Sequence, residues 1–177
     1  MRLNRSVRRW CLPGLLSLAL SAPVPVVCAA SIEAGFSPEG AALQLVLKTI
    51  DSAQQDIRLM GYSFTSPEVA WALVRAKRRG VDIRVVLDWK ANTGKNNNAS
   101  KAAMNTIVNA GIPLRTNARF AIMHDKVIIV DNHTVESGSF NFTRSGASRN
   151  PENVLVIREV PELAQTYLSV ALAIPLG

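Results

Sequence analysis

The sequence alternates between helical and strand-like patterns over residues 38–115, and this alternation constrains the fold more than any other feature. Apolar spacing and helix-start signals predict helices over residues 38–52, 66–80 and 99–110. Apolar runs predict strands over residues 56–62, 81–88 and 112–115. Strands that alternate with helices in this way are typical of a parallel sheet with helices packed on it.

Beyond residue 120 the pattern changes to strands that follow one another directly. Strand-like runs cover residues 123–130, 134–137 and 153–158, and Pro161 begins a final helix. Asp131-Asn132 is a plausible two-residue turn between the first two runs, although it lacks the glycine that such turns prefer. Because short turns join antiparallel strands, we predict an α/β fold: a single domain with a mixed β-sheet flanked by helices on both faces.

Three further segments have a structural interpretation that competes with a functional one. We interpret Lys77-Arg78-Arg79 as the charged end of a helix rather than a nucleic-acid patch, because cations favour helix C-termini. The polar segment 90–98 is either the rim of a substrate groove or simply a mobile loop. Trp71 and Trp89 are expected to pack in the core or at its edge rather than to stack on bases.

The first thirty residues have the layout of a secretory signal peptide. A basic head with four arginines precedes a leucine-rich apolar segment over residues 10–20, and small residues follow at Cys28-Ala29-Ala30. We expect cleavage after Ala29 or Ala30, a mature domain over residues 31–177, and a secreted or periplasmic protein. The apolar segment is too short for an ordinary membrane span, so an uncleaved membrane anchor is the lesser alternative.

Removal of this segment changes the composition that matters for function. Both cysteines, Cys11 and Cys28, leave with it, which excludes a disulfide framework and thiol chemistry in the mature chain. The four arginines also leave, so basic residues fall from 20 to 16 against 13 acidic residues, and the net charge falls from +7 to +3. This mildly basic balance permits a polyanionic partner without requiring one.

His124 and Lys126 stand two residues apart at the start of an apolar run. Side chains two apart in a strand share a face, so the imidazole and the ammonium are expected side by side. This pairing suits chemistry at a phosphate. His124 can attack phosphorus or move a proton near neutral pH, and Lys126 can neutralise the charge that builds on a phosphate oxygen.

The expected hairpin brings two more polar residues to the same face. With the two-residue turn described above, the register pairs His124 with Ser139 and Lys126 with Ser137. Asn141 then shares that face as well. The side chains of Ser139 and Asn141 can both donate hydrogen bonds to the oxygens of a bound phosphate.

Four other residues complete the predicted site. A histidine nucleophile needs an acceptor on its second ring nitrogen, and Glu152, at the start of the last strand, is the candidate. Asp131 is seven residues from His124, so alternation points it away, and we interpret it as the residue that fixes the turn. Arg144 and Arg149, in the loop before Glu152, are expected to contact phosphate. No cluster has metal-ligand spacing, so neither a metal nor another cofactor is predicted.

These spacings resemble those of the phospholipase D superfamily. Its signature is His-x-Lys-x4-Asp followed by Gly-Ser-x-Asn, and six residues match it in order: His124, Lys126, Asp131, Gly138, Ser139 and Asn141. Glu152 stands where the family has the carboxylate that orients the histidine. The resemblance covers nearly all of residues 32–168. It is closest to the small, secreted bacterial endonucleases that carry one motif and work without metal.

The resemblance implies a two-step cleavage of a phosphodiester by two histidines. One attacks phosphorus to form a phosphohistidine, and the other, from a second copy of the motif, protonates the leaving oxygen and then activates water. This chain holds the motif once. His133 would lie roughly 25–30 Å from His124 along a strand, too far to serve. The second histidine is therefore expected from another subunit, which predicts a homodimer with the active site at its interface.

These inferences favour a metal-independent, non-specific endonuclease that cleaves DNA, with RNA as a further candidate substrate and without stable membrane association. The alternative is a phospholipase D or phosphatidyl transferase that acts on phospholipid headgroups, since the chemistry at phosphorus is shared. A non-catalytic nucleic-acid-binding module is disfavoured, because binding alone does not need the histidine. Residues 168–177 are uncharged and contain a helix-stopping proline, which departs from the family and leaves open whether the tail permits a dimer.

Overall fold

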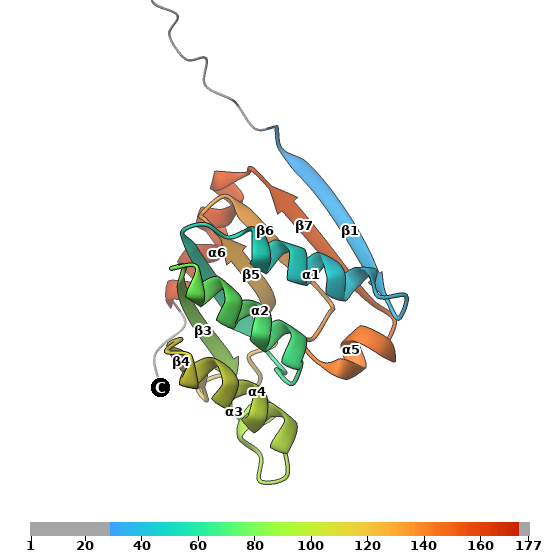
Figure 1. Ribbon diagram of the computed structural model, residues 1–177, viewed down its shortest axis with the longest axis vertical. Helices are drawn as coiled ribbons and strands as arrows, with labels where there is room; N and C mark the ends of the chain where they lie inside the picture. Colours follow the sequence, from blue (N-terminus) through green and yellow to red (C-terminus); the bar gives the residue numbers. More distant parts are fainter. Residues whose placement is uncertain (1–28, 174–177) are drawn as a thin grey trace, which may run out of the picture.

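The computed structural model describes residues 29–173, in which helices cover both faces of a mixed sheet (Figure 1). The strands are β1 (Ser31–Ser37), β2 (Asp56–Gly61), β3 (Asp82–Asp88), β4 (Leu114–Asn117), β5 (Lys126–Val130), β6 (Thr134–Gly138) and β7 (Glu152–Arg158). The helices are α1 (Ala41–Ser52), α2 (Pro67–Arg78), α3 (Trp89–Thr93), α4 (Asn98–Asn109), α5 (Arg144–Ser148) and α6 (Pro161–Ala173). Residues 1–28 of the predicted signal peptide and residues 174–177 of the tail lie outside the described residues.

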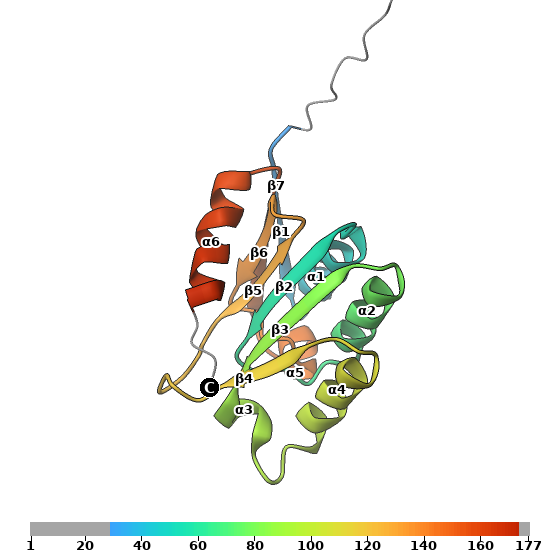
Figure 2. The same cartoon turned by 90° about the vertical axis from the view of Figure 1, so that its left-hand side faces the viewer.

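The strands lie in the order β1-β7-β6-β5-β2-β3-β4. β2, β3 and β4 are parallel to one another, and β5, β6, β7 and β1 extend the sheet by antiparallel pairs. α1, α2 and α4 cover one face, and α6 packs on the other (Figure 2). The predicted mixed sheet with helices on both faces is confirmed. Between residues 29 and 173, no helix is long and apolar enough to cross a bilayer.

Helix α2 forms where its sequence signals place it. The Ser66 hydroxyl accepts a hydrogen bond from the backbone N–H of Val69, and Pro67 occupies the first turn. Basic residues fill the last turn, where they face the negative end of the helix dipole. Arg79, just beyond, donates hydrogen bonds to three carbonyls at the end of α1. This basic cluster therefore contacts the ends of two helices.

The edge strand β1 and two short helices are additions to the predicted elements. β1 pairs only with β7, and its apolar residues Ile32 and Phe36 stay exposed, so no buried apolar face marks it in the sequence. α5 lies in the loop before β7, and α3 begins at Trp89 and extends into the predicted polar loop 90–98. α3 forms because the Asp88 carboxylate accepts a hydrogen bond from the Ala91 N–H and caps it.

Two smaller expectations are wrong. The strand predicted over residues 123–130 begins only at Lys126. Trp71 and Trp89, which we expect in or beside the core, are 51% and 47% exposed.

The hairpin between β5 and β6 is one residue out of the predicted register. Val127, rather than Lys126, pairs with Ser137, because the connecting loop holds three residues instead of two. Asp131 and Asn132 in this loop both adopt the left-handed backbone conformation, with φ of 51° and 58°. Aspartate and asparagine tolerate this conformation better than other non-glycine residues. The longer loop is therefore compatible with its sequence.

The corrected register changes how the site is assembled. His124 precedes β5 and Ser139 follows β6, so the predicted pair of these two residues does not form. Alternation within β5 itself is as expected. Ile128 packs in the core beneath α1 and α2, whereas Val127 and Ile129 pack against α6.

One ionisable residue is completely enclosed beneath the helices. Glu136 lies opposite Ile128 in the sheet and has no exposed surface. Neither of its carboxylate oxygens has a hydrogen-bond partner among the described residues. Burial raises the pKa of Glu136 well above its usual range, because a buried carboxylate loses its hydration. Burial in the folded protein therefore favours the neutral acid over the carboxylate.

This burial predicts a free energy of unfolding that decreases as the pH rises. Above the ordinary glutamate pKa the unfolded chain releases a proton that the folded chain retains, which costs up to about 1.4 kcal/mol per pH unit. Glu136→Gln cannot ionise, so it should be more stable than the wild type at pH 7 and similar to it at pH 4. Urea unfolding at both pH values measures the difference. Equal stabilities at pH 7 would contradict the prediction.

Candidate active site

One end of the sheet, where β2 ends and β5 begins, holds the predicted histidine and lysine. His124 is exposed two residues before β5, and Lys126, the first residue of β5, is 6% exposed. The Lys126 ammonium donates a hydrogen bond to the His124 carbonyl (2.8 Å). The two residues are therefore adjacent, with the imidazole accessible to solvent and the ammonium held against the backbone.

Tyr62 contacts both residues and is absent from the sequence prediction. Its ring centroid lies 4.6 Å from that of His124, with the planes tilted by 58°. The Lys126 ammonium stands over the same ring, 5.4 Å from its centroid. Tyr62 belongs to no motif, but it directly follows β2, the antiparallel neighbour of β5. Pairing β2 with β5 in the sequence prediction would have identified Tyr62 as a neighbour of His124 and Lys126.

Two buried polar residues from β3 and α3 hold this arrangement in place. The Asp88 carboxylate accepts a hydrogen bond from the backbone N–H of Met123 (2.8 Å), the residue before His124. The Asn92 amide donates to the carbonyls of Tyr62 and Asp88 (2.7 Å each). Because both side chains are buried and satisfied, they fix the backbone on either side of the imidazole.

Two effects act on the pKa of Lys126 in opposite directions. Desolvation lowers the pKa of Lys126, and the nearby carboxylates of Glu152 and Asp125 oppose that shift. Glu152 therefore lies close enough to act on the ammonium. Its own carboxylate accepts a hydrogen bond from the Asn150 amide (3.1 Å) and, within this single chain, forms no hydrogen bond with His124. Among residues 29–173, no three His, Cys, Asp or Glu side chains gather as a metal site.

The Gly-Ser-x-Asn segment is fixed by its contacts with β7. Ser139 and Asn153 exchange two hydrogen bonds, one of which leaves the serine hydroxyl proton free to donate. A side chain at Gly138 would clash with the Asn153 carbonyl, which explains the glycine. The Asn141 side-chain oxygen is buried, with no hydrogen-bond partner among the described residues. Ser139 and Asn141 therefore both retain hydrogen-bonding capacity.

The remaining predicted residues lie farther from the imidazole. Arg144 and Arg149 are exposed at the two ends of α5. Arg144 lines a hollow between α5 and α4, beside Thr65 and Ala102, so it faces that helix. No hydrogen bond or ion pair brings either arginine to His124 in the described chain.

Asp131 lies at the opposite end of β5 from His124. Its carboxylate accepts hydrogen bonds from three consecutive backbone N–H groups, those of Gln54, Gln55 and Asp56 (2.7–2.9 Å). These bonds attach the hairpin loop to the connection between α1 and β2. His133 lies at the same far end of the hairpin, 3.3 Å from the Glu159 carboxylate. The aspartate of the motif thus holds backbone, and His133 is remote from His124.

The chain matches a family model described as "Cardiolipin synthase, PLD-like domain" over residues 46–171. A protein named phospholipase D from Rickettsia felis is 32% identical over 159 residues, which is 86% of this chain and 76% of its own length. A mitochondrial cardiolipin hydrolase from Xenopus laevis is 31% identical over 146 residues, 76% of this chain and 65% of the relative.

Among solved structures, the chain is similar to Nuc from Salmonella typhimurium, a phospholipase D family member. The two are 54% identical with a TM-score of 0.80, over 82% of this chain and 94% of Nuc. The similarity therefore covers most of both chains.

The contacts of Asp131 predict a role in stability rather than in chemistry. Asp131→Ala removes three hydrogen bonds to a charged acceptor and should lower the free energy of unfolding by about 2–4 kcal/mol. Its kcat per folded molecule should stay close to that of the wild type. Denaturant unfolding and turnover of bis(p-nitrophenyl) phosphate provide the two measurements. Unchanged stability with lost turnover would place Asp131 in the chemistry instead.

The contacts of the Tyr62 ring predict that it positions His124 and Lys126. Tyr62→Leu removes the surface against which His124 and Lys126 lie and should reduce kcat on the same phosphodiester about tenfold. Tyr62→Phe keeps both ring contacts and should retain most of the activity. Equal losses in both variants would instead assign the effect to the phenol hydroxyl.

Proposed function

Because this chain belongs to the phospholipase D superfamily and is a phosphodiesterase of that kind, we propose that it is a metal-independent, non-specific endonuclease. Its substrate is the backbone of DNA, with RNA as a second substrate. The observation that carries the proposal is the exposure of the site: His124 and Ser139 both face solvent at one end of the sheet. An open site accepts a phosphodiester in the middle of a long polymer without enclosing it.

Cleavage proceeds in two displacements at phosphorus. A ring nitrogen of His124 attacks phosphorus, the bond to the leaving oxygen breaks, and that oxygen takes a proton from a second histidine. Water then attacks the phosphohistidine, gives its proton to the second histidine, and releases the phosphate monoester as the P–N bond breaks. Lys126 neutralises charge on the non-bridging oxygens, and Ser139 and Asn141 donate hydrogen bonds to them.

The second histidine comes from a second copy of the chain. The sequence contains two histidines, and the other one, His133, is bound to the far end of the hairpin. A two-fold axis near His124 would bring two imidazoles together on one phosphate. The acceptor for the outer nitrogen of each imidazole is then Glu152, either of the same subunit after rotation of its side chain or of the partner subunit.

A lipid substrate is the second candidate. It is favoured by the names of the relatives from Rickettsia felis and Xenopus laevis, a phospholipase D and a cardiolipin hydrolase. Attack on phosphorus is the same for a lipid headgroup, so the motif alone does not separate the two substrates. The predicted signal peptide supports a secreted or periplasmic location, where extracellular nucleic acid is the accessible polymer.

The test is cleavage by the purified protein in excess chelator. Plasmid DNA and single-stranded RNA should both be cut, a headgroup-labelled phospholipid should not, and His124→Asn should abolish cutting while far-UV circular dichroism is unchanged. Activity that disappears in chelator would contradict the metal-independent mechanism. Release of the lipid headgroup with intact DNA would assign the chain to the lipid enzymes.

A further inference from the structure

The segment between Asp88 and Asp125 has a one-sided charge. It contains no acidic residue and five basic ones: Lys90, Lys95, Lys101, Arg115 and Arg119. Since residues 31–177 hold 16 basic and 13 acidic residues, the rest of that domain has 11 basic against 13 acidic. The segment forms α3, α4, β4 and the loop that leads to His124, which gather on one side of the molecule (Figure 2). The positive charge of the domain is therefore concentrated beside the candidate active site.

Exposed apolar side chains accompany these cations. Trp89 is 47% exposed, Phe120 48% and Ile122 56%, although all three are large and apolar. Phe120 directly follows Arg119, and Trp89 directly precedes Lys90. Scattered aromatic side chains among cations are typical of surfaces that bind unpaired nucleotides, where bases stack on rings and phosphates contact the cations.

The backbone contacts place these aromatic residues next to His124. The Asp88 carboxylate joins the start of α3 to the residue before His124, and Trp89 directly follows Asp88. Asn117 pairs with Asp88 across the sheet, and its side-chain oxygen accepts hydrogen bonds from the N–H groups of Arg119 and Phe120. Trp89 and Phe120 are thus both held at the ends of the paired strands β3 and β4, where Asp88 also binds the residue before His124.

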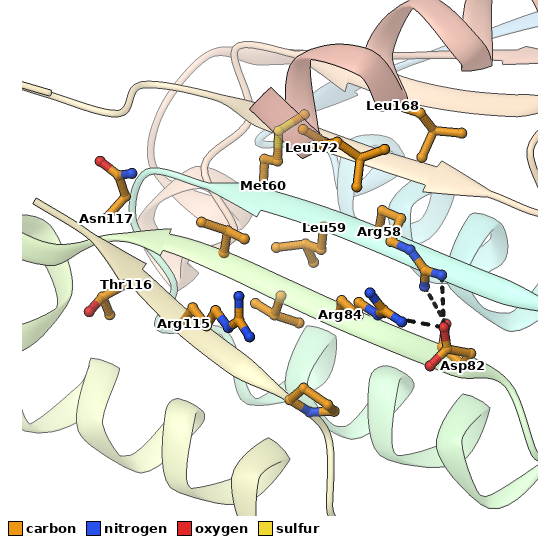
Figure 3. A pocket seen from close by; sticks show the side chains of 14 residues that line it. Arg58, Leu59, Met60, Asp82, Arg84, Arg115, Thr116, Asn117, Leu168 and Leu172 are labelled. Carbon is orange, nitrogen blue, oxygen red and sulfur yellow. Dashed lines mark hydrogen bonds and ion pairs between the residues drawn. The ribbon is translucent and has the colours of Figure 1, made fainter. Parts of the chain in front are cut away.

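A hollow of about 570 Å³ lies beside α6 on the face of the sheet that α6 covers in part, and Asn117 at the end of β4 is one of its lining residues (Figure 3). Apolar side chains form its floor and one wall, including Met60, Val86 and Leu168. Three arginines from adjacent strands line it: Arg58, Arg84 and Arg115. Asp82, the one acidic lining residue, is paired with Arg58 (2.7 Å) and Arg84 (3.8 Å), and Arg115 has no ion pair with a described residue.

We propose that Trp89, Phe120 and Arg115 form a track for a single strand of nucleic acid that leads away from His124. Bases stack on the two aromatic rings, and Arg115 and Arg119 contact phosphates. This inference rests on the proposed nuclease function and narrows its substrate to unpaired segments. A duplex is disfavoured because its base faces are already stacked, and a membrane is disfavoured because the apolar residues form no continuous surface.

Binding without cleavage tests the track directly. His124→Asn protein in chelator is titrated with fluorescein-labelled oligo-dT and with a labelled DNA hairpin duplex, and anisotropy is measured. The single strand should bind more tightly. Trp89→Ala and Phe120→Ala should each weaken single-strand binding about tenfold, the effect expected for loss of one stacked base, and should leave duplex binding unchanged. Trp89→Phe should restore binding, and Trp71→Ala, at a similarly exposed tryptophan, should have no effect.

The salt dependence of binding tests the phosphate contact separately. Arg115→Ala should reduce the slope of log K against log salt by about 0.7, the value for one phosphate of a single strand. Arg78→Ala, an exposed arginine outside the segment, should leave the slope unchanged. An unchanged slope in Arg115→Ala would remove Arg115 from the track.

Three results would overturn the proposal while leaving the nuclease function intact. The first is equal affinity for the single strand and the duplex. The second is unchanged single-strand binding by Trp89→Ala and Phe120→Ala. The third is a solution mass of a monomer for those variants where the wild type is a dimer, which would assign the rings to a subunit interface. Loss of binding to phosphatidylglycerol vesicles in the same variants would assign them to a membrane. Plasmid cleavage by the wild type is measured in a separate assay, so a failure of the proposed nuclease function is distinguished from a failure of the track.

Discussion

The hydrogen bond from the Met123 N–H to the buried Asp88 carboxylate is the contact on which the site depends. Asp88 ends β3, caps α3, and holds the backbone one residue before His124. A buried carboxylate is costly unless backbone N–H groups satisfy it, and here they come from two segments far apart in the sequence. The same interaction that lowers that cost therefore also positions the imidazole. Asn92 extends it to Tyr62, whose ring contacts both His124 and Lys126.

The residues of the family motif divide between chemistry and architecture. His124 and Lys126 stand at one end of β5, and Asp131 at the other end holds three backbone N–H groups. Gly138 is required by the close approach of Asn153, which sets Ser139 beside β7. A motif that spans a whole strand and its turns thus specifies both ends of that strand, although the residues that we propose to react occupy only one end.

Local signals in the sequence are sufficient for every strand except the exposed edge strand β1 and for the four longer helices. Ser66 and Pro67 start α2 by chemistry that acts within one turn, and alternation along β5 separates Ile128 from Val127. The failures depend on contacts between distant segments. α3 exists because Asp88 and Asn92 are satisfied by other elements, the hairpin register depends on two left-handed residues, and Tyr62 gains its role only when β2 pairs with β5. Sequence reasoning places His124 and Lys126 together correctly, but by extending the strand to residue 123, whereas β5 begins at Lys126.

We propose that one motif per chain serves a reaction that needs two histidines. Mixed dimers test this sharing of the site, after wild-type and His124→Asn chains are unfolded together and reassembled in known proportions. If both imidazoles act on one phosphate, activity follows the square of the wild-type fraction, and an equal mixture retains about one quarter of full activity. A linear decrease, with about one half retained in that mixture, would show that a single His124 suffices and would contradict the shared site.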